Sequence, residues 1–174
     1  RRCAAFRNYG GAPESLSFLV KNAENFGLAA QLNQPADVND FDTNLGFRYS
    51  PLMSECRVDI LFISHDRDDY VAKTLPRLLD SCGDLGRVWL WQNSQNEACT
   101  LAWRAYENHP KLHKIHVSAE NRGLRDPTNW IFEGGNCDYV GKVDDDCIVP
   151  DEWLGKITSA IDTNPEIGFL GCWH

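Results

Sequence analysis

The sequence predicts an α/β fold built on a largely parallel sheet, and three observations point to it. From Arg57 onward, short apolar runs alternate with stretches of helical spacing. The connections between them are short, which favours right-handed crossovers between parallel strands. The chain has 174 residues, of which 43% are hydrophobic and 24% are charged, so it can bury the core of one domain.

The first 56 residues differ from the remainder of the chain. Apolar residues at helical spacing predict a helix there: Leu16, Leu19, Val20, Ala23 and Phe26. Residues 31–55 are rich in Asn, Asp, Pro and Ser and have no steady period. We therefore expect a lead-in helix with an irregular segment over 1–56, followed by the main domain over 57–174.

Within the main domain, five short apolar runs predict strands because each is too brief for a helix and is bounded by polar or turn-forming residues. The predicted strands are 58–63, 88–91, 112–117, 139–143 and 167–170.

Two helices are expected between the first three strands. Asp68 and Asp69 suit the first turn of a helix that ends at Gly83. Its apolar face comprises Val71, Leu75, Leu78, Leu79 and Cys82. Asn96 is the predicted cap of the next helix, which ends before Pro110. Its predicted buried face comprises Ala98, Leu101, Ala102, Ala105 and Tyr106.

Two more helices follow the third and fourth strands. Asp126 and Pro127 suit the cap and first residue of a short helix. The last helix is expected to start at Asp151 and to stop before Pro165. Its apolar residues are Trp153, Leu154, Ile157, Ala160 and Ile161.

Clustered polar residues follow four of the predicted strands, at 64–67, 92–94, 121–125 and 144–146. Ligands of parallel α/β sheets bind beyond the carboxyl ends of the strands. We therefore expect these four loops to form one binding edge, which is stronger evidence for a site than any single motif.

Asp144, Asp145 and Asp146 form an acid triplet at the end of the fourth predicted strand. Adjacent carboxylates repel each other and need water, a cation or hydrogen-bond donors. On an extended chain Asp144 and Asp146 would share one face and Asp145 the other. Two carboxylates on one side suit Mg²⁺ or Mn²⁺, which complete their shell with water and phosphate oxygens. The alternative is a solvated turn whose acids favour the next helix N-terminus.

Charge and motifs exclude several function classes. The net charge of −8 disfavours a nucleic acid or an anionic membrane as the main partner. Neither G-x-G-x-x-G nor G-x-x-x-x-G-K-[ST] is present, which disfavours a dinucleotide oxidoreductase and a P-loop NTPase. Phosphate would therefore be held by a metal and side chains.

The seven cysteines are scattered and have no zinc-site spacing, so we expect thiols in a reducing compartment. The sequence has no signal peptide and no transmembrane run. The expected location is cytoplasmic, with peripheral membrane association through regions outside this sequence as the alternative.

Residues 57–173 resemble the nucleotide-sugar-binding half of a GT-A-fold glycosyltransferase and are most similar to the inverting family-two group. The resemblance rests on an ordered set of segments after the successive strands: 63–67, 92–94, 121–123 with Asn129, 144–146 and 150–154. It implies a Rossmann-like three-layer sandwich. It also implies a glycosyltransferase that takes a sugar from a nucleotide-diphosphate sugar and transfers it with inversion.

The resemblance also implies roles for single residues. Asp146 would coordinate Mn²⁺ or Mg²⁺, Asp144 would contact the nucleotide and join the metal site, and Asp145 would support the ribose contacts. The remaining donor-binding residues implied are Ser64 and Arg67 at the nucleoside, Asn93 at the base, and Asn121, Gly123 and Asn129 at the diphosphate and sugar.

Two departures from the family pattern bear on the substrate. Gln92 and Asn93 stand where the family usually carries an acidic residue for the base, so a UDP-sugar is only weakly favoured. The chain also stops at His174, just after the fifth predicted strand. The acceptor-side catalytic base and the acceptor-binding half are expected beyond that residue, in a larger protein. Glycan, lipid and protein acceptors all stay open.

Two other functions are consistent with the sequence. A catalytically incomplete domain would bind a nucleotide or a glycan without turnover. A sugar-nucleotidyltransferase would use a related sheet, but it would need a Gly-rich loop with Lys or Arg after the first strand, and residues 64–69 lack one.

Overall fold

A six-stranded sheet organises the part of the chain described by the structure, a computed structural model that covers residues 18–21 and 56–171. The strands are β1 (Phe18–Lys21), β2 (Val58–Ser64), β3 (Gly86–Gln92), β4 (Leu112–Val117), β5 (Tyr139–Asp144) and β6 (Phe169–Gly171). Their order is β4-β3-β2-β5-β1-β6. The first four in that order are parallel, and β1 lies antiparallel between β5 and β6. The predicted α/β class with a mostly parallel sheet is confirmed.

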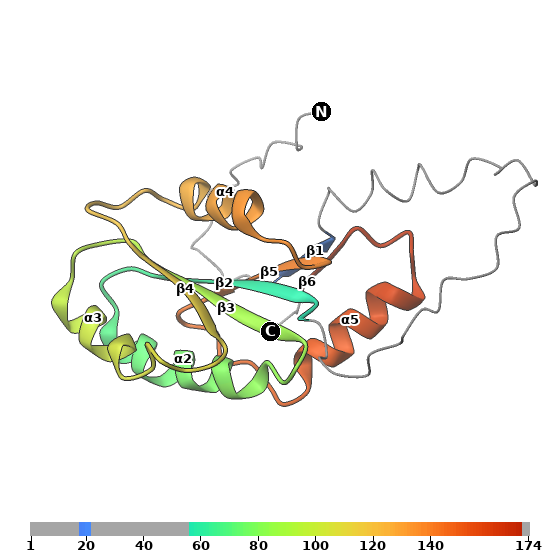
Figure 1. The fold of residues 1–174 in the computed structure, drawn as a ribbon, viewed down its shortest axis with the longest axis horizontal. Coiled ribbons are helices and arrows are strands. Elements are labelled where there is room, and N and C mark those ends of the chain that lie inside the picture. The colour runs from blue at the N-terminus through green and yellow to red at the C-terminus, as the bar shows by residue number, and fades with distance from the viewer. Residues whose placement is uncertain (1–17, 22–55, 172–174) are drawn as a thin grey trace, which may run out of the picture.

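Helices cover both faces of this sheet (Figure 1). They are α2 (Asp68–Ser81), α3 (Glu97–Arg104), α4 (Arg125–Gly134) and α5 (Trp153–Thr163). In Figure 1, α4 lies on one side of the sheet, while α2, α3 and α5 lie on the other. The result is the predicted three-layer sandwich.

The central strand β2 is buried on both faces because helices cover both. Its side chains alternate between two cores. Val58, Ile60 and Phe62 belong to the cluster that packs on α2 and α5. Leu61 and Ile63 belong to the smaller cluster beneath α4, together with Trp89 and Trp91 of β3. The alternation follows the two-residue period of a strand.

The N-terminal segment corrects one prediction. Residues Phe18–Lys21 form β1 and not part of a helix, since they pair with β5 and β6. Pairing with a sheet edge overrides the local helical spacing of this short apolar run. The other residues of the predicted helix lie outside the described residues, and the division at residue 56 stays a prediction.

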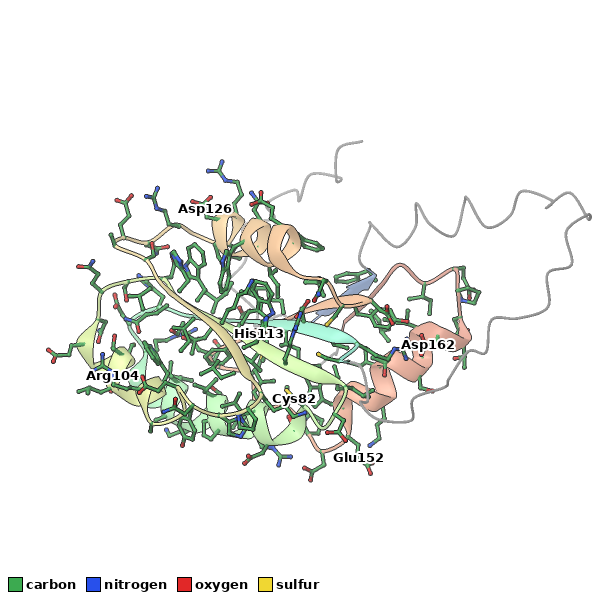
Figure 2. All side chains as sticks on the ribbon, viewed as in Figure 1. Cys82, Arg104, His113, Asp126, Glu152 and Asp162 are labelled. Carbon is green, nitrogen blue, oxygen red and sulfur yellow. The ribbon has the colours of Figure 1, made fainter. Side chains whose placement is uncertain are left out.

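Two helices differ in detail from their predictions. The Asn96 cap of α3 is confirmed, since its side chain accepts a hydrogen bond from Cys99 N. The predicted buried face of α3 is only partly correct. Cys99 and Trp103 are its buried residues, and Leu101 is 59% exposed. Ala102 and Tyr106 are partly buried against the core, as predicted. In α4, Asp126 lies in the first turn and not at the cap, because the helix begins at Arg125 (Figure 2).

The last helix and strand also start later than predicted. Helix α5 begins at Trp153, because Glu152 before it has a left-handed backbone with φ of 58°. Strand β6 begins at Phe169, where it pairs with β1. Within the described residues, no helix combines the length and the apolar character needed to cross a bilayer.

A glycine at the start of β3 makes a close approach that a larger residue would prevent. A Cβ on Gly86 would lie 2.7 Å from Leu154 Cδ2 and 3.0 Å from Ile60 Cδ1. We expect Gly86→Ala to lower the free energy of unfolding by about 1–3 kcal/mol, because the core must shift to accept it. Gly168→Ala is the control, since a Cβ there would meet no described atom within 4 Å. Urea denaturation of both variants measures the difference, and equal midpoints would contradict this packing.

Candidate functional site

The carboxyl ends of four parallel strands lie level with one another. In the strand register, Ser64 is opposite Gln92, Gln92 is opposite Val117, and Ile63 is opposite Asp144. Backbone hydrogen bonds continue past the strand ends, from Asn93 N to Ser64 O and from Ser118 N to Gln92 O, each 2.8 Å long. The four loops that were predicted to meet therefore all start at the same edge of the sheet, which is called the carboxyl edge below.

The acid triplet sits in a turn at this edge. Strand β5 ends at Asp144, and Cys147 N donates to Asp144 O at 3.0 Å, which closes a turn over Asp145 and Asp146. The predicted alternation of the three side chains fails, because strand geometry stops at Asp144. Asp145 and Asp146 instead both contact one side chain, that of Arg67.

Arg67 joins the loop after β2 to the acid triplet. Its guanidinium donates to both oxygens of Asp145, with Nε 3.3 Å from Oδ2, and to Asp146 Oδ2 at 3.0 Å. The Asp145 side chain is only 1% exposed, whereas that of Arg67 is 44% exposed. Burial raises the pKa of the Asp145 carboxyl, and the charge of Arg67 and the His65 N–H oppose that rise.

This geometry predicts a pH-dependent cost of removing Arg67. Because burial raises its pKa, Asp145 contributes stability that is present below its unfolded pKa and is lost as the pH rises through its folded pKa. Arg67→Gln removes the charge that limits this loss. We expect a decrease in unfolding free energy of about 1–3 kcal/mol at pH 7, with a smaller decrease in acid.

Urea denaturation of Arg67→Gln at neutral and acidic pH checks this prediction. Arg104→Gln is the matched control, because Arg104 is exposed at the end of α3 (Figure 2). Its effect should stay within about 0.5 kcal/mol at either pH. A loss for Arg67→Gln that is equal at both pH values would contradict the proposed charge compensation.

Three polar atoms at the carboxyl edge are buried without a hydrogen-bond partner among the described residues: Ser64 Oγ, Ser94 Oγ and Asp146 Oδ1. Buried acceptors are nearly always satisfied, so an orphan carboxylate oxygen indicates a missing water or ion. This Asp146 oxygen is therefore open to a water molecule or a cation. Asp144, two residues earlier, forms an ion pair through its Oδ1 with Lys142 Nζ. No group of three or more His, Cys, Asp or Glu suited to a metal occurs within residues 18–21 and 56–171.

The side-chain amides of Gln92, the last residue of β3, and of Asn93, directly after it, are fully engaged in hydrogen bonds. Asn93 donates to Asn121 Oδ1 and Gly123 O, and it accepts from Trp91 Nε1 and Arg122 N. Gln92 likewise uses both its amide hydrogens and its oxygen within the β3–α3 connection and α3. The Asn93 side chain thus ties two loops together. Its contact with a base stays a prediction and would require one of these bonds to break.

The loop after β4 is shaped by Asn121 and Gly123. Gly123 has a left-handed backbone with φ of 63°, and its N–H donates to Asn121 Oδ1 at 2.8 Å. Asn121 Nδ2 lies 3.3 Å from His65 Nε2, so this loop also meets the loop after β2. Asn129 is exposed on α4, and its side chain makes no hydrogen bond within the described residues. The structure therefore joins Asn121 and Gly123 to the site and leaves Asn129 outside this network.

Two residues at the site had no predicted role. Lys142 is 6% exposed and forms an ion pair with Asp144. The two-residue period of a strand places Lys142 and Asp144 on one face, so the sequence carried that signal. His65 links Asp145, through its N–H, with Asn121, through its ring, and only the fold brings those partners together.

Comparisons with known proteins agree with this architecture. Residues 59–174 match the family model described as Glycosyl transferase family 2. No curated protein is significantly similar in sequence. Among solved structures, S. aureus TarS 1-349 shares 19% identity at a TM-score of 0.51, over 63% of this chain and 33% of that chain.

S. aureus TarS in a longer form shares 18% identity at a TM-score of 0.51, over 62% of this chain and 20% of that one. The mannosyltransferase PcManGT from Pyrobaculum calidifontis, in complex with GDP-Man and Mn²⁺, shares 16% identity at a TM-score of 0.48. The match covers 79% of this chain and 38% of that chain. The chain spans about a third of the first TarS chain and a fifth of the second. The similarity to TarS confirms the predicted GT-A fold.

Proposed function

Because the chain belongs to glycosyltransferase family 2, we propose that its carboxyl edge binds a nucleotide-diphosphate sugar together with Mn²⁺ or Mg²⁺. The proposed reaction transfers the sugar to an acceptor hydroxyl with inversion. The glycan, lipid or protein that carries this hydroxyl is not specified by the proposal. UDP is the first nucleotide to test.

One observation carries the proposal: the buried Asp146 Oδ1, without a partner among the described residues, at the point where the four polar loops meet. Such an oxygen is suited to a cation. The charges nearby agree, since the three carboxylates outnumber the two cationic side chains that pair with them, Arg67 and Lys142. A site with net negative charge attracts a cation, which can then attract a diphosphate.

The residues of this chain would hold the cation and orient the nucleotide sugar. Asp146 and Asp144 would hold the cation, which supplies positive charge to the diphosphate as the glycosidic bond breaks. Arg67 fixes the position of Asp146 through its Oδ2, so Oδ1 is left for the cation. Ser64 Oγ, buried and without a described partner, is available to donate to the donor nucleoside.

The acceptor hydroxyl must lose a proton during inversion, so a general base is needed. We propose that this base belongs to an acceptor-binding part of the protein outside residues 56–171. Binding of the nucleotide sugar and transfer of the sugar to the acceptor can therefore be tested separately.

A panel of nucleotide sugars tests the function. The full chain is incubated with UDP-, GDP- and other nucleotide sugars with Mn²⁺, and release of the nucleoside diphosphate is measured. Release that requires the metal supports a transferase. Metal-dependent binding of a nucleoside diphosphate without release would identify a donor-binding domain without turnover. Preference for a nucleoside triphosphate with a sugar phosphate would indicate a nucleotidyltransferase and overturn the proposal.

A further inference from the structure

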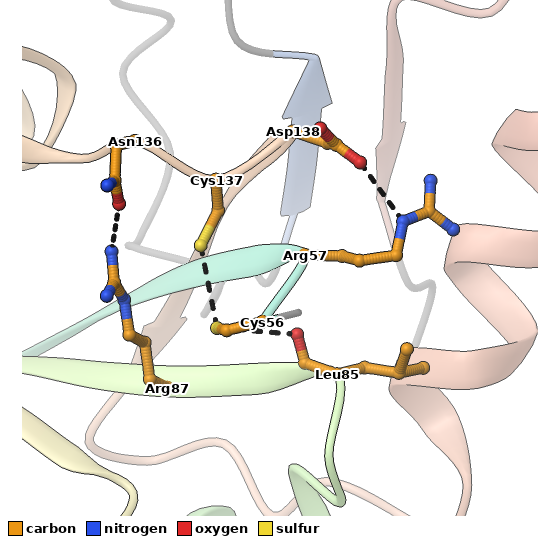
Figure 3. Close-up of a pocket in the computed structure, with 7 residues that line it drawn as sticks. All are labelled: Cys56, Arg57, Leu85, Arg87, Asn136, Cys137 and Asp138. Carbon is orange, nitrogen blue, oxygen red and sulfur yellow. Dashed lines mark hydrogen bonds and ion pairs between the residues drawn. The ribbon is translucent and has the colours of Figure 1, made fainter. Parts of the chain in front are cut away.

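A pocket of about 640 Å³ opens at the amino-terminal ends of the central strands, opposite the carboxyl edge. Cys56 precedes β2 and Cys137 precedes β5, and both line this pocket. Their Sγ atoms are 3.5 Å apart (Figure 3). Because β2 and β5 are paired, with Val58 opposite Tyr139, the register of the sheet holds the two cysteines side by side.

We propose that Cys56 and Cys137 form a dithiol site that a peroxide oxidises reversibly to an intrachain disulfide. The two sulfur atoms need to approach by about 1.5 Å to reach the bond length of roughly 2.0 Å. The inference does not rest on the proposed function, because the dithiol lies at the other edge of the sheet.

The surroundings suit Cys56 as the attacking thiolate. The Cys137 thiol donates a hydrogen bond to Cys56 Sγ, and with the charge of Arg87 it lowers the pKa of Cys56 to about 7. As a thiol, Cys56 donates to Leu85 O at 3.6 Å. Cys56 is partly exposed, whereas Cys137 is buried beneath it at 5% exposure.

The charged groups around the pair are arranged in two flanking ion pairs. On one side Arg87 bonds Asp59 and Asn136. On the other side Arg57 bonds Asp138 at 3.1 Å. Figure 3 shows the Arg87–Asn136 and Arg57–Asp138 contacts. Arg87 favours the Cys56 thiolate and Asp59 opposes it. Low-pKa thiols with partial exposure are the ones that oxidants attack first.

The reaction balances in two steps. The Cys56 thiolate attacks one peroxide oxygen, the O–O bond breaks, and the other oxygen leaves as hydroxide and takes up a proton. Cys56 is then a sulfenic acid, so its charge no longer raises the pKa of Cys137. Cys137 attacks the Cys56 sulfur, the S–O bond breaks and water leaves. Two thiols lose two electrons and two protons, and one peroxide becomes two waters.

The test treats the full chain with one equivalent of hydrogen peroxide, alkylates the remaining thiols, and maps the digest by mass spectrometry without reduction. We expect a cross-linked peptide of Cys56 and Cys137 that dithiothreitol abolishes. Cys56 should react at least about tenfold faster than Cys82, since burial raises the pKa of Cys82 to about 12. A cross-link from Cys56 to any cysteine other than Cys137 would overturn the proposal. Equal rates of reaction at Cys56 and Cys82 would also overturn it.

Variants separate the two steps. Cys137→Ser should leave Cys56 as a sulfenic acid that dimedone traps, and Cys56→Ser should abolish both the trapped species and the cross-link. Cys82→Ser is the matched control and should form the cross-link normally, because the Cys82 thiol donates to Leu78 O and not to either of the two cysteines. Trapping at Cys137 in the Cys56→Ser variant would show that the assigned order is wrong. The wild-type map decides the proposal if a variant fails to fold.

Discussion

Replacing Asp146 with Asn should weaken the metal-dependent affinity for a nucleoside diphosphate by about tenfold to 100-fold. Mutating a residue that only hydrogen-bonds to a metal ligand already lowers metal affinity by about tenfold to 100-fold. Asp146 is proposed to bind the metal directly. Asn keeps the volume of the side chain but removes the negative charge. Calorimetric titration of UDP with Mn²⁺ measures the effect.

The control for this variant is Asp151→Asn. Asp151 lies five residues farther along the chain, and its side chain is 83% exposed in a surface ion pair with Arg77. Its loss should leave binding unchanged. The melting temperature of Asp146→Asn should stay close to that of the wild type, because Asn keeps an oxygen that can accept the Arg67 hydrogen bond and Arg67 keeps its pairing with Asp145. Wild-type affinity in Asp146→Asn would remove this residue from the site.

Replacing Asp59 with Ala should lower the free energy of unfolding by about 3–5 kcal/mol at pH 7, the cost of breaking a buried ion pair. Asp59 is fully buried in β2. It accepts hydrogen bonds from Arg87 Nε at 2.5 Å, Trp89 Nε1 at 2.7 Å, and the backbone N–H of Asn136 and Cys137. The variant leaves the Arg87 guanidinium and several donors without their acceptor.

The pH dependence of this loss has a defined sign. Burial alone would raise the pKa of Asp59, but hydrogen bonds from Arg87, Trp89 and Cys137 N hold it below its ordinary value. The carboxylate therefore contributes stability above its unfolded pKa of about 3.9, and this contribution is lost as the pH falls through the folded pKa. Urea denaturation should show that Asp59→Ala and wild type converge in strong acid.

Asp151→Ala is the matched surface control for Asp59. An exposed ion pair contributes about 0–1 kcal/mol, so this variant should stay within that range at every pH. If Asp59→Ala destabilises no more than Asp151→Ala, the buried network at β2 does not hold the amino-terminal ends of the strands together.

The fold was predictable where local pattern and tertiary pairing agree. Strands β2, β3 and β5 are apolar runs in the buried centre of the sheet, so their composition predicts their position. Strand β4 lies at the edge of the sheet and is mostly exposed. Phe18–Lys21 was not predictable in this way, because its partners β5 and β6 lie more than a hundred residues away. In α3, the buried Trp103 and Cys99 lie on a face that the pattern of Ala and Leu residues did not single out.

The site was predictable as a set of loops, but its internal contacts were not. Parallel strand topology alone brings residues 64–67, 92–94, 121–125 and 144–146 to one edge. The bonds from Arg67 to Asp145 and from Asn93 to Asn121 join residues 78 and 28 positions apart, and their geometry depends on loop conformation. The buried Asp59 did leave a signal, since a single acid inside an apolar strand needs buried partners.

Paramagnetic broadening by Mn²⁺ tests the central claim, a donor and metal site at the carboxyl edge, most directly. Backbone amide spectra are recorded with UDP and either Mg²⁺ or Mn²⁺. The proposed site predicts that Mn²⁺ broadens the amides of Ser64, Asn121 and Asp146 selectively and that Asp146→Asn abolishes this effect. Broadening centred on Cys56 and Cys137 at the other edge, or uniform broadening that UDP does not change, would contradict it.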